Sequence, residues 1–261
     1  MPLASLLQPF TAETAALLIG IGFAVGAFGT LIGAGGGFIL TPILLLLYPH
    51  DSPKTITAIS LATVFFNAAS GSTAYARQRR IDYRSGLVFG LATLPGAVGG
   101  ALVVGHVSRH AFDAIMGGVL AVLAAWLLLG ERWPLRVPEN RLRRGAVYSL
   151  GVGFLSSFLG IGGGVIHVPL LVRALGFPMH VATATSHFVL AIMAGAGTVT
   201  HIVQGSFHHG HGWRRTAALS VGVIAGAQLG AHVSLRLRGA AIQLLLAAAL
   251  LALAARLLYP A

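Results

Sequence analysis

Long apolar runs separated by short polar intervals dominate this chain of 261 residues. Most of the runs reach or approach the roughly 20 residues that an α-helix needs to cross the hydrocarbon core of a bilayer. Two runs are too short, and each is joined through glycines to the run before it. The pattern predicts an all-α polytopic membrane protein with two interrupted helices. The predicted segments are 14–32, 36–48, 53–76, 85–105, 111–130, 145–159, 162–173, 178–204, 214–235 and 239–259.

The two interruptions share one motif: G-x-G-G-G, then four residues, then proline. Self-similarity at a fixed offset indicates internal repeats, and the similarity continues beyond the motif. The matching pairs are GAGGGFILTP (33–42) with GIGGGVIHVP (160–169), TAIS (57–60) with TATS (183–186), and PGAVGGA (95–101) with AGAQLGA (225–231). We therefore predict two homologous transmembrane repeats of four to five segments each, opened by a glycine-broken helix. Their ranges are 14–130 and 145–259, joined by a basic linker at 131–144.

The glycine clusters destabilise a membrane helix, since each interior glycine lowers helix stability by about 1 kcal/mol and a proline by about 3 kcal/mol. A helix broken at mid-membrane frees backbone groups, which are tolerated there only inside the protein or along a watery cavity. The amides that begin its second piece suit an anion, and paired breaks in two repeats point to a transporter's substrate site. The alternative is close helix packing through small residues. The candidate binding glycines are Gly33, Gly35, Gly36, Gly37, Gly160, Gly162, Gly163 and Gly164.

The helix after each break offers polar side chains as further candidates. Ser60 and Asn67 belong to a stripe of polar residues spaced three and four apart on the first of these helices. Ser186 corresponds to Ser60 in the second half, whereas Met193 corresponds to Asn67, so we expect the halves to bind an anion asymmetrically. In the alternative interpretation these side chains bond to backbone or bridge helices.

Two histidines complete the candidate site. His167 follows the second glycine cluster by three residues, and His187 follows Ser186 directly. An ionisable group inside a membrane span is a functional candidate, and an imidazole there could attract an anion or carry a coupled proton. The alternative is a neutral imidazole bonded to a neighbouring helix. The sequence HHGH (208–211) lacks an acidic partner, so we expect no metal and no other cofactor.

Composition supports the membrane class, because only 9% of the residues are charged and 56% are hydrophobic. The net charge of +11 is concentrated in two loops, 77–84 and 131–144, which hold nine of the seventeen lysines and arginines. We assign this charge to cytoplasmic loops and not to nucleic-acid binding. Two topologies stay open. If each broken segment crosses the membrane, the two repeats are parallel. If each folds back as a re-entrant hairpin, the repeats are inverted and the N-terminus lies outside. The inverted form is slightly favoured.

The doubled glycine motif is followed in each half by a T-x-x-S helix, a basic or aromatic turn and a G-A-x-x-G-A helix. This arrangement resembles the TauE/SafE family of sulfite exporter-like permeases over residues 15–258. The resemblance implies a multi-pass protein of a bacterial cell membrane that moves sulfur-containing anions such as sulfite, organosulfonates or sulfoacetate.

We therefore expect a secondary transporter, and an exporter, for a small anion, with the membrane potential or protons as the energy source. An anion channel and a non-transporting membrane scaffold are the alternatives. An intramembrane enzyme is disfavoured because the sequence has no cysteine, no H-E-x-x-H motif and no carboxylate within a predicted span.

Overall fold

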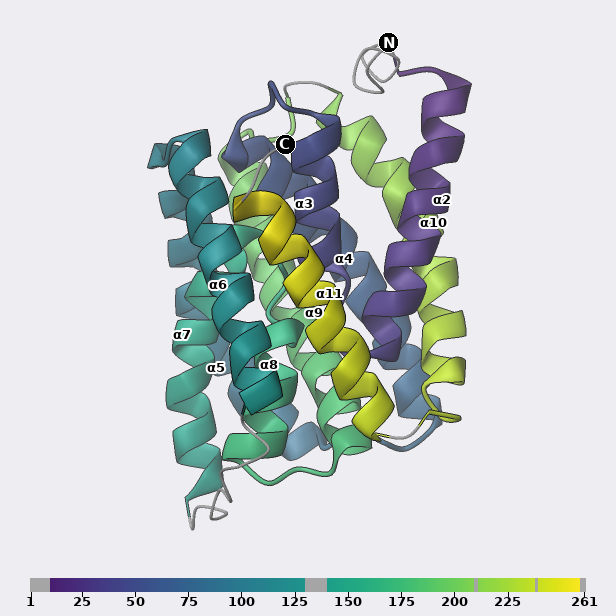
Figure 1. The fold of residues 1–261 in the computed structure, drawn as a ribbon, viewed down its shortest axis with the longest axis vertical. Coiled ribbons are helices and arrows are strands. Elements are labelled where there is room, and N and C mark those ends of the chain that lie inside the picture. Colours follow the sequence, from purple (N-terminus) through teal and green to yellow (C-terminus); the bar gives the residue numbers. More distant parts are fainter. Residues whose placement is uncertain (1–9, 130–139, 209–210, 238, 259–261) are drawn as a thin grey trace.

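The computed structural model describes residues 10–129, 140–208, 211–237 and 239–258, and over these ranges the protein is a bundle of helices without strands (Figure 1). The helices correspond to the ten segments expected from the apolar pattern. Their bounds are α2 Ala12–Leu31, α3 Gly37–Leu47, α4 Pro53–Arg77, α5 Tyr83–Val103, the short η1 Val104–His106, α6 Arg109–Leu129, α7 Arg141–Leu159, α8 Gly164–Pro169 with the π-helical η3 Leu170–Ala174, α9 Met179–Val203, α10 Gly212–Val233 and α11 Gly239–Leu258.

Local side chains fix where several of these helices begin. The Thr11 hydroxyl accepts a hydrogen bond from the Thr14 amide at the start of α2, and Ser52 does the same for Thr55 in α4. Asp82 caps α5 through the Ser85 amide. Such caps satisfy backbone donors that have no partner within the helix.

Each glycine motif turns its helix back on itself. Between α2 and α3, the φ angles of Gly33, Gly35 and Gly36 are 76–77°, a region that glycine enters without steric cost. A Cβ atom on Gly36 would lie 2.6 Å from Val25 Cγ1, so the start of α3 lies against a residue two turns before the end of α2. The equivalent turn between α7 and α8 also has three glycines with φ of 69–80°. Both broken segments are therefore re-entrant.

The two re-entrant segments enter the bundle from opposite ends. The start of α2 lies at the upper end of Figure 1, where the Phe10 ring is 6.4 Å from the His211 ring. The start of α7 lies at the lower end, together with the loop that follows α4. We call the lower end, which carries the arginines of loop 78–82 and of 141–144, the basic face, and the upper end the opposite face. Of the two topologies that the sequence left open, the structure has the inverted one.

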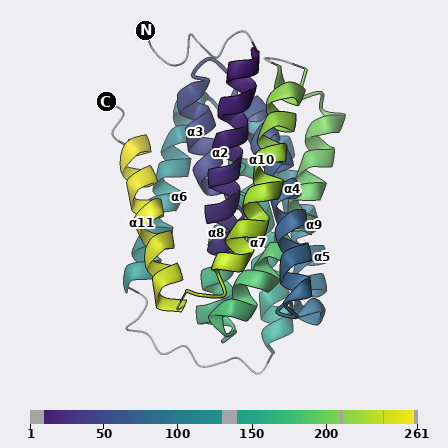
Figure 2. The ribbon, with the colours of Figure 1, turned by 90° about the vertical axis from the view of Figure 1, so that its right-hand side faces the viewer.

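The packed helix pairs follow the same inversion. α2 packs along α10 and α7 along α5, while α10 contacts α4 and α5 contacts α9. α4 packs on α9 and α6 on α11, and Figures 1 and 2 show these pairs side by side. Exchanging the five helices of the first half with the corresponding five of the second reproduces this set of pairs. The homology of the halves and their superposition stay predictions.

Glycines set the closest helix contacts. A Cβ atom on Gly222, Gly226 or Gly230 of α10 would overlap the carbonyl oxygen of Ile19, Phe23 or Ala27 of α2. Both sets advance by four residues, so the two helices run parallel with their backbones almost touching, as in small-residue interfaces of membrane helices. In the same way, Gly96 and Gly100 of α5 lie against the carbonyls of Leu150 and Phe154 of α7.

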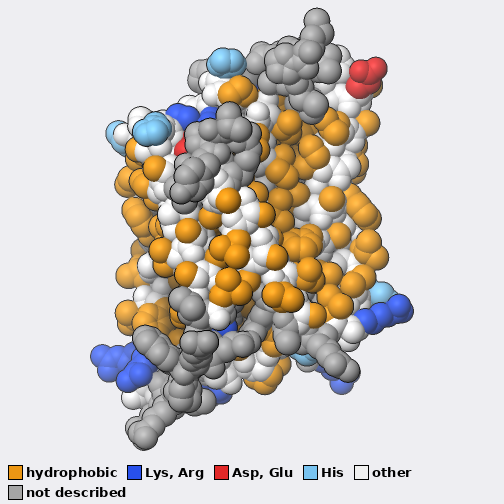
Figure 3. All heavy atoms as spheres, in the orientation of Figure 1, with side chains coloured by type: hydrophobic (Ala, Val, Ile, Leu, Met, Phe, Trp, Pro, Cys, Tyr) orange, Lys and Arg blue, Asp and Glu red, His pale blue; other side chains and the backbone are white. Residues whose placement is uncertain are grey.

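The outer surface carries a broad apolar band between two polar ends (Figure 3). Within the described residues, four helices are long and apolar enough to cross a membrane: Ala12–Leu31, Tyr83–His106, Met179–Val203 and Gly212–Val233. Their outward side chains include Val203 and Leu91, which are 83% and 60% exposed. Apolar side chains in a continuous band are stable in lipid and costly in water, so the band marks the membrane-embedded surface.

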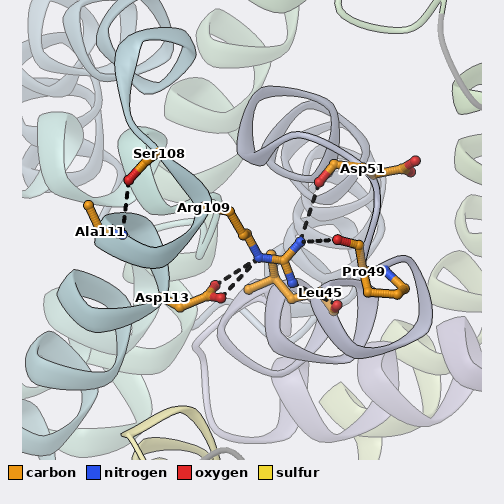
Figure 4. Close-up of polar contacts among 7 residues, drawn as sticks. All are labelled: Leu45, Pro49, Asp51, Ser108, Arg109, Ala111 and Asp113. Carbon is orange, nitrogen blue, oxygen red and sulfur yellow. Dashed lines mark hydrogen bonds and ion pairs between the residues drawn. The ribbon is translucent and has the colours of Figure 1, made fainter.

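Two arginines hold the loop between α3 and α4 at the opposite face. The Arg109 guanidinium, from the start of α6, donates to the carbonyls of Leu45 and Asp51 and pairs with Asp113 at 3.0 Å (Figure 4). Arg215 of α10 lies 2.6 Å from the Asp51 carboxylate and 3.6 Å above the Tyr48 ring, and is only 3% exposed. Burial raises the pKa of Tyr48 more than the Arg215 charge lowers it, so the phenol is neutral near pH 7.

The glycine contact between α2 and α10 gives a first test. Gly226→Ala places a methyl group against the Phe23 carbonyl, and overpacking of about 1–3 kcal/mol should outweigh the gain of about 1 kcal/mol in helix propensity. The melting temperature of the purified protein should therefore fall. Gly20→Ala is the control, because nothing lies within 4 Å of its Cβ position, and it should raise the melting temperature. Equal effects of the two substitutions would contradict the packing.

The inverted arrangement gives a second test. The chain has no cysteine, so single cysteines placed at Gln78, Asn140 and His50 can be labelled cleanly in cells with a membrane-impermeant maleimide. Positions 78 and 140 lie at the basic face and should be labelled alike, from the cytoplasmic side only. Position 50 lies at the opposite face and should be labelled from outside. Labelling of position 50 from the cytoplasmic side would contradict the arrangement.

Candidate functional site

The two breaks meet at the centre of the bundle. A Cβ atom on Gly37, at the start of α3, would lie 2.7 Å from the Ile161 carbonyl in the other break. A Cβ atom on Gly164, at the start of α8, would lie 2.6 Å from the Gly33 carbonyl oxygen. The fold thus brings together all eight glycines that the sequence singled out, and all eight are buried.

Apolar side chains fill the space beside these glycines. A Cβ atom on Gly162 would lie 2.6 Å from Val64 Cγ1 and 3.1 Å from Leu190 Cδ1, and one on Gly35 would overlap Leu190. Val64 of α4 and Leu190 of α9 occupy corresponding places in the two halves. In this conformation the glycines permit close packing, as the alternative interpretation held. At Gly36 a φ of 76° and the adjacent Val25 both oppose a side chain.

Side chains of α3, α4 and α9 bind the carbonyl groups that the breaks expose. Ser60 Oγ donates to the Gly160 carbonyl at 2.7 Å, and Thr41 Oγ1 donates to the same oxygen at 2.9 Å. Ser186 Oγ donates to the Gly33 carbonyl at 3.3 Å, which gives each break a serine from the other half. Serine hydroxyls therefore replace helical hydrogen bonds that the breaks remove, and in this state both are bonded to backbone.

Asn67 joins a buried polar group on the basic-face side of the first break. Its Nδ2 donates to the Gly35 carbonyl at 2.8 Å, and its Oδ1 accepts from Thr30 Oγ1 at 3.0 Å. Thr30 Oγ1 also lies 3.1 Å from His187 Nε2, and Tyr75 donates from its hydroxyl to the Thr30 carbonyl at 2.6 Å. These four side chains have no solvent exposure. We call Thr30, Asn67, Tyr75 and His187 the central polar group.

His187 keeps one ring nitrogen free. Among the described residues its buried Nδ1 atom makes no hydrogen bond, and the backbone of Gly33 lies close to the ring. Gly71 makes room for the ring, since a Cβ atom there would lie 2.5 Å from His187 Cδ2. A buried polar atom without a partner is costly, so this nitrogen is the position in the central polar group from which a further hydrogen bond can be made.

The corresponding place in the second half is mostly apolar. Gly197 is the counterpart of Gly71, and a Cβ atom on it would lie 2.8 Å from Ser157 Oγ and 3.0 Å from Leu61 Cδ1. Leu61, the counterpart of His187, thus lies beside Gly197 as His187 lies beside Gly71, and Met193 corresponds to Asn67. The side chains at the centre are therefore arranged asymmetrically even though the helix pairs follow the inversion.

His167 is hydrogen-bonded to a residue outside the central polar group. Its Nε2 is 3.0 Å from Ser149 Oγ of α7, and its side chain is 1% exposed. A histidine bonded to a neighbouring helix is the alternative that the sequence left open for this residue.

Thr30 and Tyr75 were not identified as site residues from the sequence. The only signal for them was position: Thr30 lies three residues before Gly33, and Tyr75 lies one turn after Gly71.

The central polar group offers uncharged donors and acceptors and no carboxylate. The described residues contain no group of three histidine, aspartate or glutamate side chains that could hold a metal ion. Such a set can hydrogen-bond a small anion without a permanent countercharge.

The whole bundle matches a family model described as "Sulfite exporter TauE/SafE", over residues 18–257. The chain belongs to this family. It is 28% identical to "Probable membrane transporter protein YunE" of Bacillus subtilis over 93% of this chain and 97% of that protein. It is 29% identical to "Probable membrane transporter protein YfcA" of Escherichia coli over 84% of this chain and 81% of the other. No solved structure matches. The TauE/SafE match and these relatives identify a membrane transporter.

The left-handed glycines give a third test. Gly36→Ala forces a φ that L-residues avoid and presses a methyl group against Val25, so we expect a loss of about 1–3 kcal/mol of stability. The check is the melting temperature in detergent. Gly151→Ala on α7 is the control, because its Cβ position is open. A normal melting temperature with weakened anion binding would contradict the packing role and favour direct approach of an anion to these amides.

Proposed function

We propose that this TauE/SafE protein is a multi-pass secondary transporter that exports a small sulfur-containing anion, of the sulfite, organosulfonate or sulfoacetate type, across a bacterial cell membrane. The observation that carries the proposal is the meeting of two re-entrant broken helices, from opposite faces, beside a buried polar group with a free ring nitrogen. Paired broken helices in inverted halves are a recurrent architecture of substrate sites in secondary transporters. The proposal includes no catalytic step.

The conformation described is closed at its centre. Val64 and Leu190 fill the space between the breaks, and the Asp51–Arg215 ion pair holds α10 to the loop before α4 at the opposite face. Transport therefore requires these side chains to move away from the glycines. Because each helix pair of one half has a counterpart in the other, the halves could exchange conformations and open the centre to one face and then to the other.

The central polar group suits a small oxyanion. Thr30, Asn67 and His187 lie within hydrogen-bonding distance of one another or of backbone oxygens, so an entering anion would compete for donors that are already pre-positioned. A hydrogen bond to a charged group contributes about 1.5–3 kcal/mol. Arg80 lies 5.3 Å over the Tyr75 ring, but its hydrogen bonds go to Gln78 and Ser234, so we expect anion binding to stay weak enough for release.

Two energy sources fit export. A membrane potential that is negative inside contributes about 2.3 kcal/mol per charge and 100 mV, and it drives an anion outward. A proton carried by His187 is the other source, because histidine is the side chain that changes charge near neutral pH and its Nδ1 is free in this conformation.

Transport can be measured with purified protein in proteoliposomes loaded with labelled sulfite, sulfoacetate or another organosulfonate. We expect saturable flux of one of these anions, faster when the potential drives anions toward the receiving side. Flux that never saturates would indicate the channel, and the absence of flux for every anion would favour a scaffold. Either result would overturn the proposal.

His187→Gln gives the fourth test, because glutamine can still bond to Thr30 but cannot carry a proton. We expect stimulation of flux by a pH gradient to fall at least tenfold, with part of the gradient-free flux retained. His201→Gln is the matched control, since His201 is equally buried but is bonded to Ser206 outside the central polar group. If His187→Gln keeps full stimulation by the gradient, His187 is not the proton carrier.

A further inference from the structure

A cavity opens at the basic face between the first turns of α5 and α7. Its volume is about 450 Å³. It is lined by Asp82, Arg84, Ser85, Asn140, Arg141, Leu142 and Arg143. No residue of the central polar group lines this cavity, and transport as proposed above makes no use of it.

A second cavity continues the first toward the membrane-embedded surface. It has a volume of about 370 Å³, shares Asn140 and Arg143 with the first, and also touches Arg144. Its far side is formed by Val147 and Tyr148 of α7, whose side chains are 66% and 43% exposed. The combined space thus leads from a basic rim to exposed apolar side chains of α7. We call the two cavities together the α5–α7 cleft.

Positive charge in the α5–α7 cleft exceeds negative charge. Among the described residues that line it, Arg84, Arg141, Arg143 and Arg144 face a single carboxylate, that of Asp82. This carboxylate is already engaged, since it accepts hydrogen bonds from the Ser85 amide at 3.1 Å and hydroxyl at 2.8 Å. In the part of the chain that the structure describes, the ion pairs are Arg109–Asp113 and Arg215–Asp51, so the arginines of the cleft have no carboxylate partner there.

Arg141 differs from the other three arginines because its guanidinium lies 5.0 Å above the ring of Phe177. Its stem is held in the wall of the cleft by this contact with the loop before α9. Arg84 and Arg143 are exposed and make no such contact, so their guanidinium groups are available to an anion. They come from different halves, Arg84 from α5 and Arg143 from α7.

We propose that the α5–α7 cleft binds the headgroup of an anionic phospholipid. The phosphate would lie among Arg84, Arg141 and Arg143, and the glycerol and first acyl carbons would run along Val147 and Tyr148. Basic pockets between membrane helices at the cytoplasmic side suit such headgroups, and a freely soluble anion would make no use of the apolar part of the cleft. The bound lipid would join α5 to α7, and so one half of the bundle to the other.

The test compares two double variants that remove the same charge from the same face. The double variant Arg84→Gln, Arg143→Gln removes two guanidinium groups from the cleft. Arg77→Gln with Arg236→Gln is the matched control, since both residues are exposed at the basic face and neither lines the cleft. Each protein is placed in nanodiscs of phosphatidylcholine alone or with added phosphatidylglycerol, and its melting temperature is measured. Native mass spectrometry counts the phosphatidylglycerol molecules retained.

We expect phosphatidylglycerol to raise the melting temperature of the wild-type protein and of the control by roughly 5 °C, with at least one lipid retained. The cleft variant should lose most of this shift and the retained lipid, while melting normally in phosphatidylcholine. If the cleft variant melts early in phosphatidylcholine, Arg143→Gln alone replaces it, because Arg143 lines both cavities.

Three outcomes would overturn the proposal. Phosphatidylglycerol could fail to stabilise the wild-type protein. The two double variants could lose the shift equally, which would show a diffuse effect of charge. Inorganic phosphate added to phosphatidylcholine nanodiscs could reproduce the full shift in the wild-type protein but not in the cleft variant, which would identify a site for a soluble anion. Flux of sulfite is measured separately, so failure here leaves the transport proposal intact.

Discussion

A helix that stops in the middle of a membrane must find partners for the backbone groups it frees, because lipid supplies none. In this bundle the freed carbonyls of Gly33, Gly35 and Gly160 are bound by Ser186, Asn67 and Ser60. The donors come from α4 and α9, which is why these two helices must occupy the centre. Since Ser186 serves the first break and Ser60 the second, each half supplies a donor to the break of the other. Asn67 adds a donor to the first break from the same half.

The same requirement explains the dense use of glycine. To bring α4 and α9 within hydrogen-bonding distance, both turns must be compact, and left-handed φ angles at Gly33, Gly36 and Gly163 achieve this. A second set of glycines allows the outer helices to pack closely. Among them is Gly226, which lets α10 contact the backbone of α2. The bundle thus holds its helices together by close backbone contact, which suits a membrane protein because lipid gives little hydrophobic drive for helix association.

The buried side chains at the centre do not follow the symmetry of this frame. His187 and Asn67 stand where the other half has Leu61 and Met193, so the two halves share a scaffold but differ in chemistry. The central polar group lies toward the basic face, where the Arg80 guanidinium is 5.3 Å from the centre of the Tyr75 ring. The proposed lipid cleft lies at this face as well, where α5 and α7 from the two halves begin side by side.

The sequence by itself determined the class of the protein, the ten helical segments and the two breaks, because apolar runs and clustered glycines are local properties of the chain. It also identified Asn67 and His187, since a polar side chain within an apolar run is visible without a structure. The tertiary structure alone decided between inverted and parallel halves. It also showed that Val64 and Leu190 fill the space at the glycines, that Ser60 and Ser186 bind backbone, and that Thr30 and Tyr75 belong to the central polar group. Each of these depends on contacts between residues far apart in the chain, and no spacing within the sequence encodes which distant atoms a turn will face.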